Sequence, residues 1–168
     1  RSGSTLLSAL LNQNTDCYVT TVSPLVEILW SNYILWDKGN NIPEFNIRKM
    51  QDIKKPFLRN LQKSFHSEFT DRKYVFDKRR QWQNITNIRM FIDIYGYRPK
   101  IVCPVRDVPT IFTSFDRVLK DNDIDMKADT DKFHNFCYED PIFGSTYSQL
   151  KEVYNSEYRD CLHLIEFE

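Results

Sequence analysis

Short apolar runs alternate along this chain with longer stretches in which apolar residues recur every three or four positions. The runs predict four strands, over Cys17–Val22, Tyr74–Asp77, Lys100–Val105 and Cys161–Phe167. The longer stretches predict helices, because that spacing places apolar side chains on one helical face. Since strands alternate with helices of ordinary length, the pattern predicts an α/β fold whose parallel sheet is covered by helices on both faces.

Helix starts and stops can be read at several positions. Leucines 6, 7, 10 and 11 predict a helix that begins at Ser4 or Thr5. Ser23 and Pro24 form a typical helix start, a capping residue followed by proline in the first turn. Four further helices are predicted: Phe57–Phe65, Ile85–Tyr95 with Gly96 as its stop, a helix from Asp107 or Val108 to Leu119, and Tyr147–Tyr158.

Composition narrows the classes of protein. The chain has 168 residues, the length of one domain, and 41% of them are hydrophobic, which argues against wholesale disorder. Its 23 Lys and Arg balance its 23 Asp and Glu, so bulk positive charge gives no reason to expect nucleic acid or a membrane surface as partner. Neither a membrane-spanning run nor a signal peptide is seen, and the four scattered cysteines predict reduced, mostly buried thiols in a cytoplasmic protein.

The neutral balance conceals two charged segments. Asp71–Arg80 is rich in basic residues, which suggests a site for a small anion, with a solvated basic face as the alternative. Asp121–Asp131 is acidic and is interpreted as a solvated face. Its spaced aspartates match the first positions of a calcium loop, but Met126 and Lys132 stand where glycine and glutamate are needed, so no metal is expected.

The pentapeptide Arg1, Ser2, Gly3, Ser4, Thr5 leads directly into the first predicted helix. Glycine allows close backbone approach, and the new helix offers free N–H groups and two hydroxyls, which together suit a phosphate. A serine-rich turn is the alternative interpretation. A magnesium–ATP loop is disfavoured, because it needs Gly-Lys-Ser/Thr and the basic residue here precedes the glycine.

Two other strand-to-helix junctions carry cations, and ligands of such sheets bind beyond the carboxyl ends of strands. Arg106 follows the third strand, and Ser114 lies about two helical turns later, a combination that can clamp a phosphate. Pairing of Arg106 with Asp107 or Asp116 is the alternative. Lys78 follows the second strand, within a basic segment that is electrostatically unfavourable as a helix start.

Three stretches, RSGSTLLSALLNQN, VFDKRRQW and KIVCPVRDVPTIFTSF, resemble the sulfotransferases that use 3'-phosphoadenosine-5'-phosphosulfate (PAPS), in particular bacterial and phage-type members. The resemblance covers most of the chain and implies a three-layer P-loop-type fold. It implies that Arg1–Thr5 surround the 5'-phosphosulfate and that Arg106 and Ser114 hold the 3'-phosphate. Lys78 matches the family lysine at the transferring sulfonate, and Ile165–Glu168 resembles the start of a family strand end. The resemblance implies no metal, and Arg1 and Lys78 would be the catalytic cations around the oxygen that gains charge during in-line transfer.

The general base cannot be carried over from the family. The steroid and phenol enzymes have a histidine two residues after the lysine, where this chain has Arg80, and the tyrosylprotein enzymes place a glutamate near Thr21. Two candidates remain for the proton of the acceptor. They are Glu27, which alternatively is a favourable acid early in a helix, and Asp77, which alternatively is a structural partner of Lys78 or Arg79.

The expected function is therefore transfer of a sulfonate to a hydroxyl or amine of a small-molecule or glycan acceptor. Two alternatives stay open: a small P-loop kinase or nucleotide-binding protein, and a binding module without catalysis. We also expect the single domain to be cut at both ends, because no strand precedes Arg1 and Glu168 falls at the end of a strand. The tryptophans offer aromatic surface for an acceptor, with a place in the core as the alternative.

Overall fold

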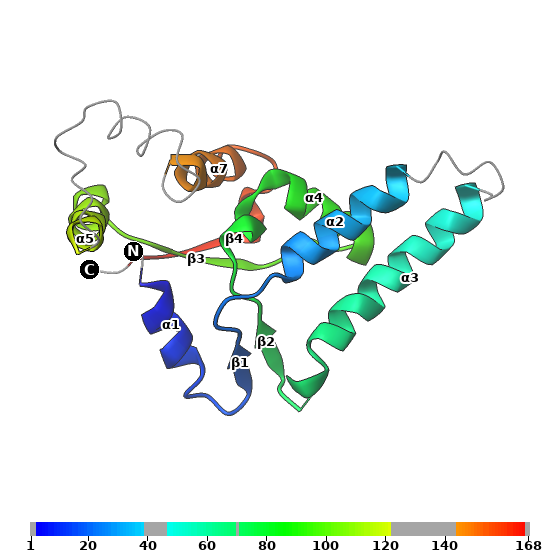
Figure 1. The fold of residues 1–168 in the computed structure, drawn as a ribbon, viewed down its shortest axis with the longest axis horizontal. Coiled ribbons are helices and arrows are strands. Elements are labelled where there is room, and N and C mark those ends of the chain that lie inside the picture. Colours follow the sequence, from blue (N-terminus) through cyan, green and yellow to red (C-terminus); the bar gives the residue numbers. More distant parts are fainter. Residues whose placement is uncertain (1–2, 39–46, 70, 122–143, 167–168) are drawn as a thin grey trace. The chain divides into compact units, whose positions relative to one another are not determined.

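The structure, a computed structural model, describes residues 3–38, 47–69, 71–121 and 144–166 (Figure 1). Arg1 and Ser2 of the predicted phosphate loop, and all but the first residue of the acidic run, lie outside the described residues. The chain divides into two compact units. Unit 1 consists of residues 1–7 and 100–168, and unit 2 of residues 8–99. Helix α1, Ser4–Leu11, contributes its first half to unit 1 and its second half to unit 2.

Unit 2 is built on a pair of parallel strands. Its elements in chain order are β1 (Cys17–Val19), α2 (Leu25–Lys38), α3 (Ile47–Phe65), η2 (Ser67–Phe69), β2 (Tyr74–Phe76), η3 (Arg80–Gln83) and α4 (Ile85–Tyr95). Strands β1 and β2 lie side by side (Figure 1), with Cys17 opposite Tyr74 and Val19 opposite Phe76. Since both strands run the same way, the residues that follow them meet at one edge of the pair.

The core of unit 2 lies between its three long helices. Leu25, Val26 and Leu29 of α2 cluster with Leu58 of α3 and with residues of α4, and all are almost inaccessible to solvent. Ser23 starts α2 as predicted, because its Oγ accepts a hydrogen bond from the N–H of Leu25 at 3.1 Å. Burial of this apolar cluster fixes the start of α2, and with it Glu27 in the first turn.

Unit 1 contains the second parallel pair. Its elements are β3 (Ile101–Val105), α5 (Val108–Lys120), α7 (Gly144–Tyr154), η4 (Arg159–Cys161) and β4 (Leu162–Glu166). Ile101 lies opposite Leu162 and Val105 opposite Glu166. Asp107 caps α5, since its Oδ2 accepts a hydrogen bond from the N–H of Thr110 at 2.8 Å.

The predicted mixed α/β fold with parallel strand pairing is confirmed. The larger sheet covered on both faces is not seen: among the described residues the strands form two sheets of two strands each. Cys17, Cys103 and Cys161 are buried and are not joined in disulfides, as predicted for these three. None of the helices described is long and apolar enough to cross a bilayer.

Candidate functional site

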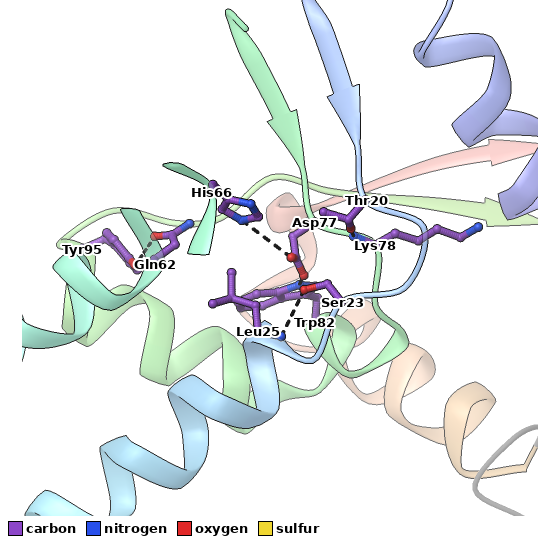
Figure 2. A network of polar contacts seen from close by, with 9 residues as sticks. All are labelled: Thr20, Ser23, Leu25, Gln62, His66, Asp77, Lys78, Trp82 and Tyr95. Atoms are coloured by element: carbon purple, nitrogen blue, oxygen red, sulfur yellow. Dashed lines mark hydrogen bonds and ion pairs between the residues drawn. The ribbon is translucent and has the colours of Figure 1, made fainter. Parts of the chain in front are cut away.

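The two loops that leave β1 and β2 are hydrogen-bonded to each other. The N–H of Thr20 donates to the carbonyl of Phe76 at 3.0 Å, and the N–H of Lys78 donates to Thr20 Oγ1 at 2.7 Å. The N–H of Ser23 donates to the carbonyl of Lys78 at 3.3 Å. These bonds hold the main chain of Lys78 beside the loop that starts α2 (Figure 2).

The side chains of Asp77 and Lys78 point in opposite directions (Figure 2). Lys78 is half-buried and extends away from His66 and Trp82, whereas Asp77 turns toward them. The side chains of these two adjacent residues therefore lie in different environments.

Asp77 lies in a largely buried polar cluster. Its Oδ1 accepts a hydrogen bond from Trp82 Nε1 at 2.6 Å, and its Oδ2 lies 3.7 Å from His66 Nε2. Burial lowers the pKa of His66, and the Asp77 carboxylate opposes that shift only in part. Asp77 is thus a structural partner of Trp82 and His66, whereas Arg79, one of its two predicted partners, pairs with Glu27.

Glu27 lies in the first turn of α2, where Arg79 directs two guanidinium nitrogens at its Oε1, with Nε at 2.5 Å. The second carboxylate oxygen, Oε2, is buried and has no hydrogen-bond partner in the part of the chain that the structure describes. Because the pair is partly exposed, it adds at most about 1 kcal/mol to stability. The chief consequence of the pair is that the Glu27 carboxylate is held in one orientation.

Glu27 also lines a pocket of about 230 Å³ within unit 2. The other lining residues come from α2, from η3 and from the start of α4: Val26, Trp30, Gln81, Asn84, Thr86 and Asn87. The pocket therefore combines an apolar and aromatic wall with a carboxylate and side-chain amides, the mixture found in small-molecule sites.

Unit 1 holds the other predicted residues. Gly3 has a φ of 83°, a conformation that glycine favours, and its carbonyl accepts the N–H of Leu7 at 2.9 Å, so it starts α1. Ser4 and Thr5 form the first turn of that helix. This turn belongs to the same compact unit as Arg106 and Ser114, although those two residues lie about a hundred positions later in the sequence.

Arg106 follows β3 directly, as predicted, and its side chain is exposed. The hydrogen bond from Thr110 lowers the pKa of Asp107, and the nearby Arg106 guanidinium lowers it further by a smaller amount. Asp116, the other suggested partner of Arg106, forms an ion pair with Lys120 at 3.0 Å. Ser114 is half-buried within α5.

Sequence reasoning misses several residues of this region. His66 has no motif around it, and only the fold brings it to Asp77. Arg79 belongs to the basic segment that the sequence indicates, but its pairing with Glu27 cannot be read from the chain. Among the tryptophans, Trp30 and Trp82 pack against the core cluster, so the core interpretation holds for both, while Trp30 also lines the pocket.

Comparison with protein-family models, with curated proteins and with solved structures finds no match to this chain. Within the described ranges, no group of three or more histidine, cysteine, aspartate or glutamate side chains is arranged to hold a metal ion.

Proposed function

We propose that the chain is a sulfotransferase that moves a sulfonate group from PAPS to a hydroxyl or amine of a small-molecule or glycan acceptor, on a three-layer P-loop-type fold. The observation that carries this proposal is in unit 1. A left-handed glycine opens α1, and the two hydroxyl residues that follow share a compact unit with Arg106 and Ser114. That donor set suits a nucleotide with phosphates at two positions.

The residues divide into a nucleotide set and a transfer set. Arg1 to Thr5 would bind the 5'-phosphosulfate, and Arg106 with Ser114 the 3'-phosphate. In unit 2, Lys78 follows the end of β2, at the position where such folds bind ligands. Its ammonium group would stabilise the charge that develops on the leaving phosphate oxygen.

Glu27 is the better candidate for the general base. The acceptor oxygen forms its new bond to sulfur while the bond from sulfur to the 5'-phosphate oxygen breaks, and the acceptor proton must go to a base. Both candidate carboxylates, Glu27 and Asp77, have one buried oxygen without a hydrogen-bond partner among the described residues, but of the two it is Glu27 that lines the pocket. Asp77 is held by Trp82 and His66, so we assign it the positioning of the loop that carries Lys78.

The first test compares two nucleotides. 3'-Phosphoadenosine-5'-phosphate should raise the melting temperature of the protein, and magnesium–ATP should raise it much less. Stabilisation by magnesium–ATP alone would overturn the proposal in favour of a P-loop kinase. If the bisphosphate binds tightly and labelled sulfonate reaches no member of a glycan, lipid and phenol panel, the chain is a binding module instead.

A second test concerns Arg106. Arg106→Ala should weaken the bisphosphate nucleotide about tenfold or more, because a hydrogen bond to a charged group contributes about 1.5–3 kcal/mol. The same substitution should hardly change the binding of adenosine-5'-phosphate, which lacks the 3'-phosphate. Arg117→Ala, which removes another exposed arginine of unit 1, is the matched control. A mutant that still discriminates the two nucleotides as the parent does would exclude this role.

A further inference from the structure

The position of Lys78 is set by bonds outside the strand pairing. The register of β1 and β2 ends at the pair Val19 and Phe76, so it stops short of Lys78. Residues beyond such a pairing need other partners for their main-chain polar groups, because an unpaired group away from water costs free energy. For Lys78 those partners lie in the loop that follows β1.

Both main-chain polar groups of Lys78 are bonded to that loop. Its N–H donates to Thr20 Oγ1 at 2.7 Å (Figure 2), and its carbonyl accepts the N–H of Ser23 at 3.3 Å. Any residue except proline has the N–H that the second bond needs, whereas the first bond needs a side-chain acceptor at position 20. The anchoring of Lys78 therefore depends on the chemistry of the Thr20 side chain.

Thr20 is itself held in place. It is buried, with 7% of its surface exposed, and its N–H donates to the carbonyl of Phe76 at 3.0 Å. A β-branched side chain is restricted in χ1, so its hydroxyl has little freedom to move. Asp77, which lies between Phe76 and Lys78, accepts a hydrogen bond from Trp82 Nε1 at 2.6 Å. The chain is therefore bonded at each of these three successive residues, and at Lys78 the Thr20 hydroxyl makes the bond.

A fixed main chain matters for a lysine because its ammonium group is carried on a long, flexible stem. The side chain of Lys78 extends away from His66 and Trp82, toward which Asp77 points (Figure 2). A shift of the Lys78 main chain would displace the ammonium group with it. Since a displacement of about 1 Å at a reacting centre can lower a rate on the order of a hundredfold, the bond to Thr20 bears on where that charge acts.

We propose that Thr20 is a positioning residue, whose hydroxyl fixes the main chain of Lys78 and thereby the place of its ammonium group. The anchoring itself involves unit 2 alone. Its consequence for catalysis rests on the proposed function: without the Thr20 hydroxyl, Lys78 would stabilise the charge on the leaving phosphate oxygen less well, while the nucleotide would still bind to its own set of residues.

Thr20→Val and Thr20→Ser, made in the full chain, separate the hydroxyl from the methyl group. Valine keeps the branched shape but lacks the acceptor, whereas serine keeps the acceptor but lacks the methyl group. Gly96→Ala, which strains the end of α4 at a φ of 79°, is the control for lost stability. If Thr20→Val does not fold, Thr20→Ala against Thr20→Ser gives the same comparison, because those two variants differ by the hydroxyl alone.

The first measurement is hydrogen exchange at the Lys78 amide, followed by NMR. Exchange should be about tenfold faster in Thr20→Val, which corresponds to the loss of one hydrogen bond worth about 1.4 kcal/mol. The reference is the amide of Tyr74, which donates to the Asp16 carbonyl at 2.9 Å at the other end of β2. Thr20→Ser should exchange like the parent. No acceleration at Lys78, or equal acceleration at Tyr74, would overturn the anchoring.

The second measurement is sulfonate transfer from PAPS, with kcat and KM determined separately. Thr20→Val should lower kcat about ten- to a hundredfold and leave the KM for PAPS within about twofold, because the lost interaction acts in the transition state. Thr20→Ser and Gly96→Ala should keep the parent's kcat. Full transfer by Thr20→Val, or an equal loss in Thr20→Ser, overturns the positioning role and leaves the sulfotransferase intact. A parent without transfer, whose Lys78 amide still exchanges faster in Thr20→Val, rejects the sulfotransferase and not the anchoring.

Discussion

At the scale of single residues, the two candidate bases differ in what holds them. One oxygen of Asp77 accepts a hydrogen bond from the indole of Trp82, and the other is buried 3.7 Å from the imidazole of His66, without a hydrogen-bond partner among the described residues. Glu27 likewise uses one oxygen for Arg79 and has the other buried without a partner among the described residues, but this residue also lines a pocket. A base must reach its substrate, so position rather than residue type separates them.

Glu27→Gln tests that assignment. The amide keeps an oxygen for Arg79 and the shape of the pocket but cannot take a proton, so the rate of sulfonate transfer should fall about 10²–10⁴-fold. Asp77→Asn keeps an oxygen for Trp82 and should lower stability while transfer survives. Transfer rates and thermal melts of both variants decide the question. The assignment is wrong if Asp77→Asn loses transfer and Glu27→Gln retains it.

His66 should make stability depend on pH. Its pKa in the folded protein is lowered by burial, so the unfolded chain takes up a proton at a pH where the folded chain does not. The free energy of unfolding should therefore fall as the pH drops below about 6.5, the value for an unperturbed histidine, and level off only below the folded pKa. Urea titrations that start at neutral pH and extend below this value measure the effect.

His66→Gln should remove that part of the pH dependence. His163→Gln, at an exposed position of β4, is the control and should leave the profile as it is. Identical profiles for the parent and His66→Gln would show that His66 does not carry the effect.

At the scale of elements, the local signals in the sequence predict the helices well. Asn84 to Gly96 shows why: a capping asparagine, a stripe of apolar residues and a terminal glycine define α4 without any distant contact. The apolar spacing predicts α3 only from Phe57 onward, yet it begins at Ile47 and continues through Pro56. Pro56 and Asp52, four residues before it, are exposed, so the carbonyl that loses its N–H partner lies on the solvent side.

Gly96 offers a test of one element end. It has a φ of 79°, and an added Cβ would meet nothing within 4 Å, so a substitution is penalised by backbone strain alone. Gly96→Ala should therefore lower the free energy of unfolding by about 1–2 kcal/mol. Gly96→Asn should cost less, because asparagine tolerates the left-handed region better. Equal losses in denaturant titrations would contradict strain as the cause.

At the scale of the whole molecule, sequence reasoning finds strands and cations but not how they assemble. It places Lys78 and Arg106 after strands, which the structure confirms, because a strand end is a local feature. It does not predict the pairing of Arg79 with Glu27, 52 residues apart, or the contact of His66 with Asp77. Such contacts depend on how α2 and β2 pack, and periodicity carries no information on that.

The two units should differ in their local stability. In unit 2, six residues of α2, α3 and α4 form one buried cluster, with Trp30 and Trp82 packed against it. In unit 1, the buried hydrophobic residues among those described are Cys103, Val153 and Cys161. Amides whose opening exposes more buried apolar surface exchange more slowly. Hydrogen exchange followed by mass spectrometry should therefore show α2 and α4 protected about tenfold longer than β3 and β4.

Binding of the bisphosphate nucleotide should reduce the difference in hydrogen exchange between the two units. Because its proposed ligands are mainly in unit 1, its binding should slow exchange in β3 and α5, by mass action on the folded form. Helix α3 is the reference, because it contributes no residue to the proposed nucleotide set. Slower exchange confined to α2 and α3 would place the nucleotide in unit 2 and separate it from Arg106.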